Sequence, residues 1–324
     1  MDSNANANAN SPTNTLDPIV IAARGNEITG LDIFQKTEDD FELPRVGELM
    51  SQMHADQPTG GIDMVYGKTD TQHLRFWKAN PSKSSESSKA PIIVFVHGGS
   101  WRSGTNLDSI GSTKVGHLTE LGYAFASINY TLFPTVTVEE QVQEIANSIN
   151  YLVKNASDLS IDPERVVLMG HSSGAHVVTL LGTDTRYLER AGTSVSIVQA
   201  VIALDGSNYN AAAELNDNPG QIADHMLDAF GTDLARLHDM SPTYHARAPN
   251  AHAFLLLHTH RHGDIRQGVE FVAALKAAGT EAVLHVFEGQ GFEGHMQVLL
   301  RLGDRKYPAT VVMDSWLEGN VPVN

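Results

Sequence analysis

The chain of 324 residues contains no cysteine. Disulfides, thiolate metal sites and cysteine nucleophiles are therefore excluded, and stability must come from a packed core. Positive charge is also scarce, because 22 lysines and arginines stand against 38 aspartates and glutamates, for a net charge of −16. So acidic a surface repels phosphate backbones and anionic membrane surfaces, and nucleic acid is not an expected partner.

Long apolar runs are missing as well. No segment approaches the roughly 20 consecutive apolar residues that a membrane-spanning helix needs. The first 20 residues also lack the basic and apolar regions of a signal peptide. We therefore predict no membrane span and a cytoplasmic location.

The N-terminal end differs in composition from the rest of the chain. Residues 1–16 alternate Asn and Ala and then continue with Ser, Pro and Thr, which predicts a disordered tail. Residues 17–324 are long enough for a single large α/β domain. Within it, we predict an N-terminal arm over residues 17–60. Residues 206–250 are a long polar and helical insertion between two strands, and we predict that they form a lid.

From residue 91 onward, apolar runs of strand length alternate with amphipathic helical segments. This alternation is typical of an α/β fold, with a mostly parallel central sheet and helices on both faces. We expect an antiparallel strand pair ahead of it, at 63–66 and 73–77. The predicted parallel strands are 92–96, 124–129, 165–169, 200–204, 254–258 and 282–287. The predicted helices are 115–121, 138–154, 175–182, 266–278 and 309–317.

The most informative motif is Gly170-His171-Ser172-Ser173-Gly174. An apolar run at 166–169 precedes it and a small, apolar helical pattern follows it, which is the strand, turn and helix context of a nucleophile elbow. Glycines flank the serine because the turn is tight and neighbouring backbone passes close by. A G-x-S-x-G pattern also arises by chance, as a glycine-rich turn with a solvated serine. The flanking pattern favours Ser172 as a nucleophile.

A serine nucleophile needs a histidine to take its proton. His295 is the predicted base, because it lies in a glycine-rich loop, 288–295, after the last strand. The other histidines include His258, His260 and His262, which alternate and could suggest a metal site. We predict no metal, since the run leaves the strand and no carboxylate follows at a fixed spacing.

The histidine in turn needs a carboxylate that orients it, and the motif implies the chain order Ser, acid, His. Asp264 follows the strand 254–258 and is the predicted acid, although it could also cap the next helix. Asp205, at the end of the strand 200–204, is the alternative. Both would reach the carboxyl edge of the sheet, where ligands bind in such folds.

Hydrolysis of an acyl group also requires donors for the oxyanion, and rigid backbone N–H groups serve well. His97-Gly98-Gly99-Ser100-Trp101 follows the strand 92–96, and its two glycines allow main chain to approach a ligand closely. We predict an oxyanion hole made by the N–H groups of Gly98, Gly99 and Ser173. Trp101 is expected to bind substrate in the acyl pocket, or simply to pack.

Four motifs together resemble the α/β-hydrolase superfamily, and more narrowly its esterases with an H-G-G-x-W loop. They lie at residues 97–101, 129–134 (Asn-Tyr-Thr-Leu-Phe-Pro), 162–166 (Asp-Pro-Glu-Arg-Val) and 170–174. This group includes hormone-sensitive-lipase-like carboxylesterases, feruloyl and acetylxylan esterases, and kynurenine formamidases. The chain departs from the usual pattern at Ser100, where a third glycine is customary. It also lacks the customary H-G-x-x-D around Asp264.

We therefore expect a cofactor-independent serine hydrolase of the carboxylesterase type. It would cleave the carboxylic ester of a small or medium acyl or aryl substrate through an acyl-enzyme. The resemblance also implies an alternative, the hydrolysis of an N-formyl aryl amide by the same residues. A third reading is a non-catalytic hydrolase fold used for binding, but such proteins usually lose the serine or the histidine. The oligomeric state is open, with a homodimer as one option.

Overall fold

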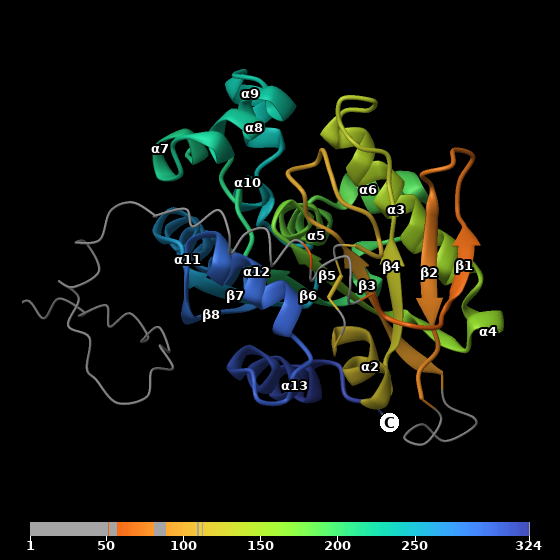
Figure 1. The fold of residues 1–324 in the computed structure, drawn as a ribbon. Coiled ribbons are helices and arrows are strands. Elements are labelled where there is room, and N and C mark those ends of the chain that lie inside the picture. Colours follow the sequence, from red (N-terminus) through yellow and green to blue (C-terminus); the bar gives the residue numbers. More distant parts are fainter. Residues whose placement is uncertain (1–50, 52–56, 81–88, 109, 112, 324) are drawn as a thin grey trace, which may run out of the picture.

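The computed structural model describes residue 51 and residues 57–80, 89–108, 110–111 and 113–323 (Figure 1). The predicted disordered tail, 1–16, lies outside these residues, as does nearly all of the predicted arm, 17–60. None of the helices in the described ranges is long and apolar enough to cross a membrane.

The described residues form one eight-stranded sheet in the order β1-β2-β4-β3-β5-β6-β7-β8. β1 and β2 pair antiparallel, and β2 pairs antiparallel with β4. All other neighbouring strands are parallel, which confirms the prediction of a mostly parallel sheet. The bounds are β1 Ile62–Val65, β2 His73–Trp77, β3 Ala90–Val96, β4 Ala124–Ile128, β5 Ile161–His171, β6 Val198–Leu204, β7 Ala253–His260 and β8 Glu281–Gln290.

The central strands are apolar on both faces because helices cover both. Along β3, Ile92 and Val94 pack into one hydrophobic cluster, whereas Ile93 and Phe95 pack into a second one. This alternation follows from the two-residue period of a strand, and it explains the unbroken apolar runs in the sequence. The helices that fill the first cluster are α3 (Val138–Lys154), α5 (Ser173–Thr183), α6 (Thr185–Ala191) and α11 (His262–Ala277). Those of the second are α2 (Thr113–Glu120), α12 (Gly291–Arg301) and α13 (Pro308–Asn320).

The insertion between β6 and β7 is helical, as predicted. It holds α7 (Glu214–Asp217), α8 (Gln221–Phe230), α9 (Leu234–Asp239) and α10 (Pro242–His245), which group together at one end of the sheet (Figure 1). Arg236 on α9 makes two hydrogen bonds to Glu139 on α3, at 2.7 and 2.9 Å. Arg102 reaches Asp228 on α8 at 2.9 Å. These ion pairs connect the insertion to the main domain.

Helix α12 corrects one prediction from the sequence. Residues 288–295 were expected to form a loop, but β8 continues to Gln290 and α12 begins at Gly291. Gly289 and Gly291 have positive φ, at 134° and 53°, so the glycines make a sharp strand-to-helix turn. The helix then buries Met296 and Leu299. Three short helices were also missed: α4 (Ala156–Leu159), α6 and the 3₁₀ turn η2 (Val195–Ile197).

Candidate active site

Ser172 lies on the sharp turn that the sequence predicts. It joins the end of β5 to the start of α5, has φ 56° and ψ −123°, and is partly exposed. A Cβ atom on Gly170 would lie 2.2 Å from the carbonyl oxygen of Gly174. A Cβ atom on Gly174 would lie 2.2 Å from the carbonyl oxygen of Val96. Both glycines are therefore required by the close approach of backbone, as in a nucleophile elbow.

The glycine-rich loop after β3 runs beside this turn. A Cβ atom on Gly98 would lie 2.8 Å from Cβ of Ser172, and Gly99 has φ 123°, which favours glycine. The N–H of Trp101 donates to Oγ of Ser173 at 3.3 Å. The structure thus brings the loop residues predicted for the oxyanion hole to the nucleophile turn.

Aromatic packing fixes both ends of this loop. The ring of His97 stacks on Tyr130 at 4.5 Å between centroids, and the Tyr130 hydroxyl donates to the His97 carbonyl at 2.9 Å. Burial lowers the pKa of His97 to about 4, so its ring is neutral at pH 7. Trp101 is only 3% exposed and packs on the rings of His176, at 5.5 Å, and Phe230, at 4.7 Å. The structure thus gives Trp101 a packing position against α5 and α8.

His295 lies beside Asp205. Nδ1 of His295 is 2.6 Å from Oδ2 of Asp205, and the two side chains are 12% and 0% exposed. Asp205 directly follows β6 and has φ 45°. His295, the base predicted from the sequence, therefore has a buried carboxylate partner. This partner is Asp205, the alternative acid of the sequence analysis.

Asp264, the acid preferred from the sequence, makes other contacts. It lies in the first turn of α11, where it forms an ion pair with Arg261 at 2.7 Å and accepts a hydrogen bond from Asn218 at 3.0 Å. Gly263 next to it lies so close to the insertion that a Cβ there would be 2.4 Å from the Asp217 carbonyl oxygen. Because the first turn of α11 packs on the insertion, Asp264 is directed toward α7 and not toward His295.

Several donors converge on the Asp205 carboxylate. Oδ1 accepts from the N–H of Thr259 at 2.8 Å, and Oδ2 accepts from Arg261 at 2.9 Å. Nδ1 of His258 lies 3.5 Å from Oδ1. Burial raises the pKa of Asp205, but the charge of Arg261 and the bonds from His258 and His295 outweigh it and hold that pKa well below its usual range. Asp205 is therefore ionised at neutral pH.

His295 is kept in its neutral form. Burial and the charge of Arg261 lower its pKa, and the opposing effect of Asp205 is smaller. The ring of His171 lies 4.4 Å from that of His295, and Nε2 of His171 contacts the His295 carbonyl oxygen at 3.0 Å. With Nδ1 engaged by Asp205, the neutral ring leaves Nε2 free to act as a base.

Sequence reasoning missed three residues of this site: His171, Thr259 and Arg261. His171 was taken as the variable position of the motif, and Thr259 and Arg261 lie in the polar run that ends β7. That run follows a buried strand at the carboxyl edge of the sheet, which is the signal that could have identified them.

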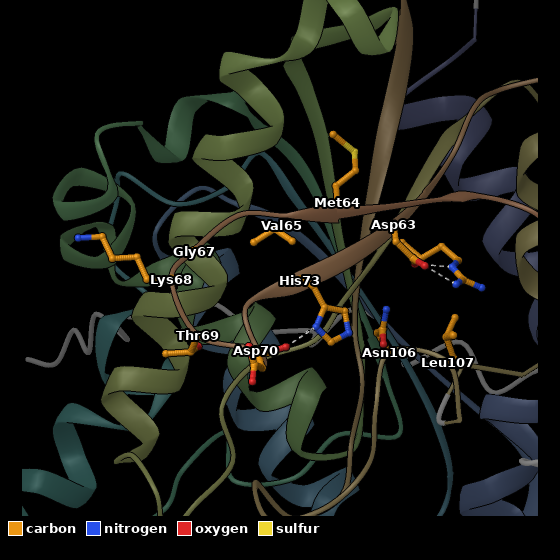
Figure 2. A pocket seen from close by; sticks show the side chains of 11 residues that line it. Asp63, Met64, Val65, Gly67, Lys68, Thr69, Asp70, His73, Asn106 and Leu107 are labelled. Carbon is orange, nitrogen blue, oxygen red and sulfur yellow. Dashed lines mark hydrogen bonds and ion pairs between the residues drawn. The ribbon is translucent and has the colours of Figure 1, made fainter.

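A surface cleft of about 480 Å³ lies elsewhere, over β1 and β2 (Figure 2). In this cleft, Arg75 makes two hydrogen bonds to Asp63, each 2.7 Å, and His73 contacts the Asp70 backbone carbonyl. None of the predicted site residues, all of which are described, lines this cleft.

The BD-FAE family model matches residues 80–274, more than half of the chain. An isoprenylcysteine α-carbonyl methylesterase from Arabidopsis thaliana is 34% identical over 151 residues, 45% of this chain and 34% of that protein. A kynurenine formamidase from Drosophila melanogaster is 33% identical over 91 residues, 28% of this chain and 29% of that protein. The chain thus spans about a third of the length of these curated relatives.

A solved structure resembles the whole domain. The native form of Est2, a thermophilic esterase from the Planctomycetes species Thermogutta terrifontis, superposes with a TM-score of 0.65 at 22% identity. The match covers 82% of this chain and 94% of that one. It confirms the predicted α/β-hydrolase fold.

Proposed function

The chain belongs to the BD-FAE family, and from this premise we propose that it is a serine hydrolase of the carboxylesterase type. It cleaves the carboxylic ester of a small or medium acyl or aryl substrate. Ser172 is the nucleophile, His295 is the general base, and Asp205, in place of Asp264, orients His295. Esterases among the relatives and the structural neighbours support a hydrolase, and the site geometry supports these residue roles.

The reaction proceeds in two halves. Nε2 of His295 takes the hydroxyl proton of Ser172 as Oγ attacks the ester carbonyl carbon, and the imidazolium then gives this proton to the leaving alkoxide. An alcohol leaves and an acyl-enzyme remains. In the second half, His295 takes a proton from water, the hydroxide attacks the acyl carbon, and Ser172 regains its proton as the carboxylic acid departs.

The tetrahedral oxyanion is held by backbone N–H groups of Gly98, Gly99 and Ser173. Ser173 begins α5, so its N–H lies at the positive end of the helix dipole. Each such donor contributes about 10²–10³ in rate. Trp101 fixes the end of this loop, because its ring is buried between His176 and Phe230.

One observation carries the proposal: the 2.6 Å contact between Nδ1 of His295 and Oδ2 of Asp205. A buried carboxylate at Nδ1 places the ring proton there, so that Nε2 is left unprotonated. It also stabilises the imidazolium that forms when Ser172 loses its proton. An isolated histidine near a serine would do neither.

The test combines a fluorophosphonate probe with p-nitrophenyl esters of graded acyl length. We expect the probe to label the wild-type chain, and Ser172→Ala to lose labelling and at least about 10³-fold in kcat. Ser157→Ala, an exposed serine on α4, is the matched control and should behave as wild type. Labelling that persists in Ser172→Ala would contradict the proposal, and so would a wild-type chain that neither reacts nor hydrolyses.

A second candidate is hydrolysis of an N-formyl aryl amide by the same residues. The observation in its favour is the local identity to kynurenine formamidases, 33% and 34% over 91 and 112 residues in two proteins. N-formylkynurenine is therefore assayed beside the p-nitrophenyl esters. A kcat/KM for it that exceeds the values for the esters would favour the formamidase over the esterase.

A further inference from the structure

We infer that Arg261 is a positioning residue for the catalytic histidine: its guanidinium fixes the Asp205 carboxylate and keeps the His295 imidazole uncharged between turnovers. This inference rests on the proposed function of the site. It gives a role to a buried charge that the reaction itself does not use.

Arg261 lies beside both the acid and the histidine, which contact each other directly. It lies at the start of α11, and only 13% of its side chain is exposed. Nη1 donates to Oδ2 of Asp205 at 2.9 Å and to the Asp205 carbonyl oxygen at 3.1 Å. The same nitrogen lies 3.1 Å from Nδ1 of His295. On its other side, Nη2 pairs with Asp264 at 2.7 Å.

Oδ2 of Asp205 is therefore shared between Arg261 and His295. In a simple Ser-His-Asp arrangement, the carboxylate alone faces the imidazole and favours its protonated form. Here a permanent positive charge faces the same ring and opposes protonation. The lowered pKa of His295 agrees with this arrangement. The resting imidazole can then accept the serine proton at a lower pH.

The other titratable groups around His295 do not replace this charge. His171 on β5 lies against the His295 ring, but burial lowers its pKa well below the usual value. His258 on β7 faces the far oxygen of Asp205. Lys114 on α2 donates to the Leu299 carbonyl of α12, and burial lowers its pKa to about 7. Arg261 alone among these groups stays charged throughout the pH range in which a histidine titrates.

A purely structural role would have different consequences. Arg261 also connects the end of β6 to α11 through Asp205 and Asp264, so its removal could lower stability and activity at every pH alike. A role in setting the charge of His295 changes the pH dependence instead. The acid limb of kcat/KM reports the pKa of the base in the free enzyme, and it therefore separates the two roles.

The first experiment compares pH profiles of p-nitrophenyl acetate hydrolysis. In Arg261→Met, we expect the midpoint of the acid limb to rise by about one pH unit, because the opposing charge is lost and His295 stays protonated to higher pH. Arg261→Lys keeps the charge and should return the midpoint toward the wild-type value. Arg266→Met is the matched control, since Arg266 lies on the same helix, is about half exposed, and pairs with Asp217; its profile should not move.

Removing Arg261 leaves Asp264 buried without its counter-charge, and this could unfold the chain. The double variant Arg261→Met/Asp264→Asn removes both members of that ion pair and should show the same shift of the acid limb. The inference would be overturned if the acid limb of kcat/KM stayed in place in both variants while the plateau value of kcat/KM fell.

The second experiment does not need activity. In Ser172→Ala, the pKa of the His295 ring is measured by NMR of histidine-labelled protein, with His295→Asn identifying the signal. Introducing Arg261→Met should raise that pKa by about one unit, and an unchanged pKa would refute the role of Arg261. Failure of the proposed function would show separately, as ester hydrolysis that survives Ser172→Ala.

Discussion

Asp205 and His295 are 90 residues apart in the chain, yet Oδ2 of the one lies 2.6 Å from Nδ1 of the other. Asp205 follows β6, whereas α12, which carries His295, follows β8. Between these strands lies β7. The contact therefore spans the carboxyl end of β7, and there the N–H of Thr259 donates to the same carboxylate at 2.8 Å. The three strand ends together hold Asp205 and His295 in one geometry.

Replacing the two candidate acids should separate their roles. In Asp205→Asn, an amide beside Nδ1 favours the wrong tautomer of His295, so we expect kcat to fall by about 10³–10⁴. Asp264→Asn should cost far less. The Asp264 carboxyl group contacts Arg261 and Asn218 and is not the partner of Nδ1 of His295. Steady-state kinetics of both variants tests which carboxylate orients His295. A larger loss of kcat in Asp264→Asn than in Asp205→Asn would restore Asp264 as the acid.

The glycines of the nucleophile turn should tolerate no side chain. In Gly174→Ala, the added Cβ would meet the Val96 carbonyl oxygen at 2.2 Å. The backbone of β3 must then shift, and we expect a loss of about 1–3 kcal/mol in the free energy of unfolding. Gly116→Ala is the matched control, because Gly116 is also helical but has open space where its Cβ would stand. Gly116→Ala should raise the free energy of unfolding by about 0.5–1 kcal/mol. Equal effects of the two variants in denaturant titrations would refute the packing argument.

Local pattern was sufficient for the fold and for the glycine-rich turn and loop of the candidate site. The central strands were found because their apolar runs are unbroken. The amphipathic pattern placed α3 at its observed bounds, and the structure adds a capping box of Thr137 and Glu140 at its start. The sharp turn at Ser172 and the close approach of the loop at Gly98 and Gly99 could be predicted because close backbone contacts leave a signature of glycines in the sequence itself.

The carboxylate that contacts His295 could not be identified in this way, because the contact depends on tertiary packing. Asp205 and Asp264 both follow strands of the parallel sheet, and nothing local distinguishes them. The packing of α11 distinguishes them. The first turn of α11 lies on the insertion, and this contact directs Asp264 toward Asn218. The helical state of His295 was missed for a related reason, since α12 is rich in glycine at its start and is stabilised by the burial of Met296 and Leu299.

Acid should destabilise the fold in part through His176. Burial lowers its pKa to about 4, and the unperturbed value is 6.5. Between these values, the unfolded chain binds the proton and the folded chain does not, so stability falls as the pH drops from 6.5 toward 4. One such group contributes a slope of up to about 1.4 kcal/mol per pH unit.

The variant His176→Asn should reduce the slope of unfolding free energy against pH by the contribution of one proton. The smaller side chain also lowers stability at every pH. Asparagine cannot titrate, and it is too short to reach the Met240 carbonyl that Nε2 of His176 contacts at 2.7 Å. Free energies of unfolding measured from pH 4 to 7 test this. His252→Asn, an exposed histidine, is the control and should leave the slope as in wild type; an unchanged slope in His176→Asn would show that His176 titrates normally.

The ring of Phe230 should hold α8 against the loop 97–101 that follows β3. It packs on Trp101 at 4.7 Å and on His176 at 5.4 Å, and it is fully buried. Phe230→Ala removes that ring and should lower the free energy of unfolding by about 3–5 kcal/mol. Trp101 is 3% exposed, and loss of the ring that packs on it should open it to solvent, so acrylamide should quench tryptophan fluorescence more strongly in the variant. Leu234→Ala, an exposed residue on α9, is the control, and equal quenching in both variants would mean that α8 does not cover Trp101 in solution and that the insertion opens as a lid.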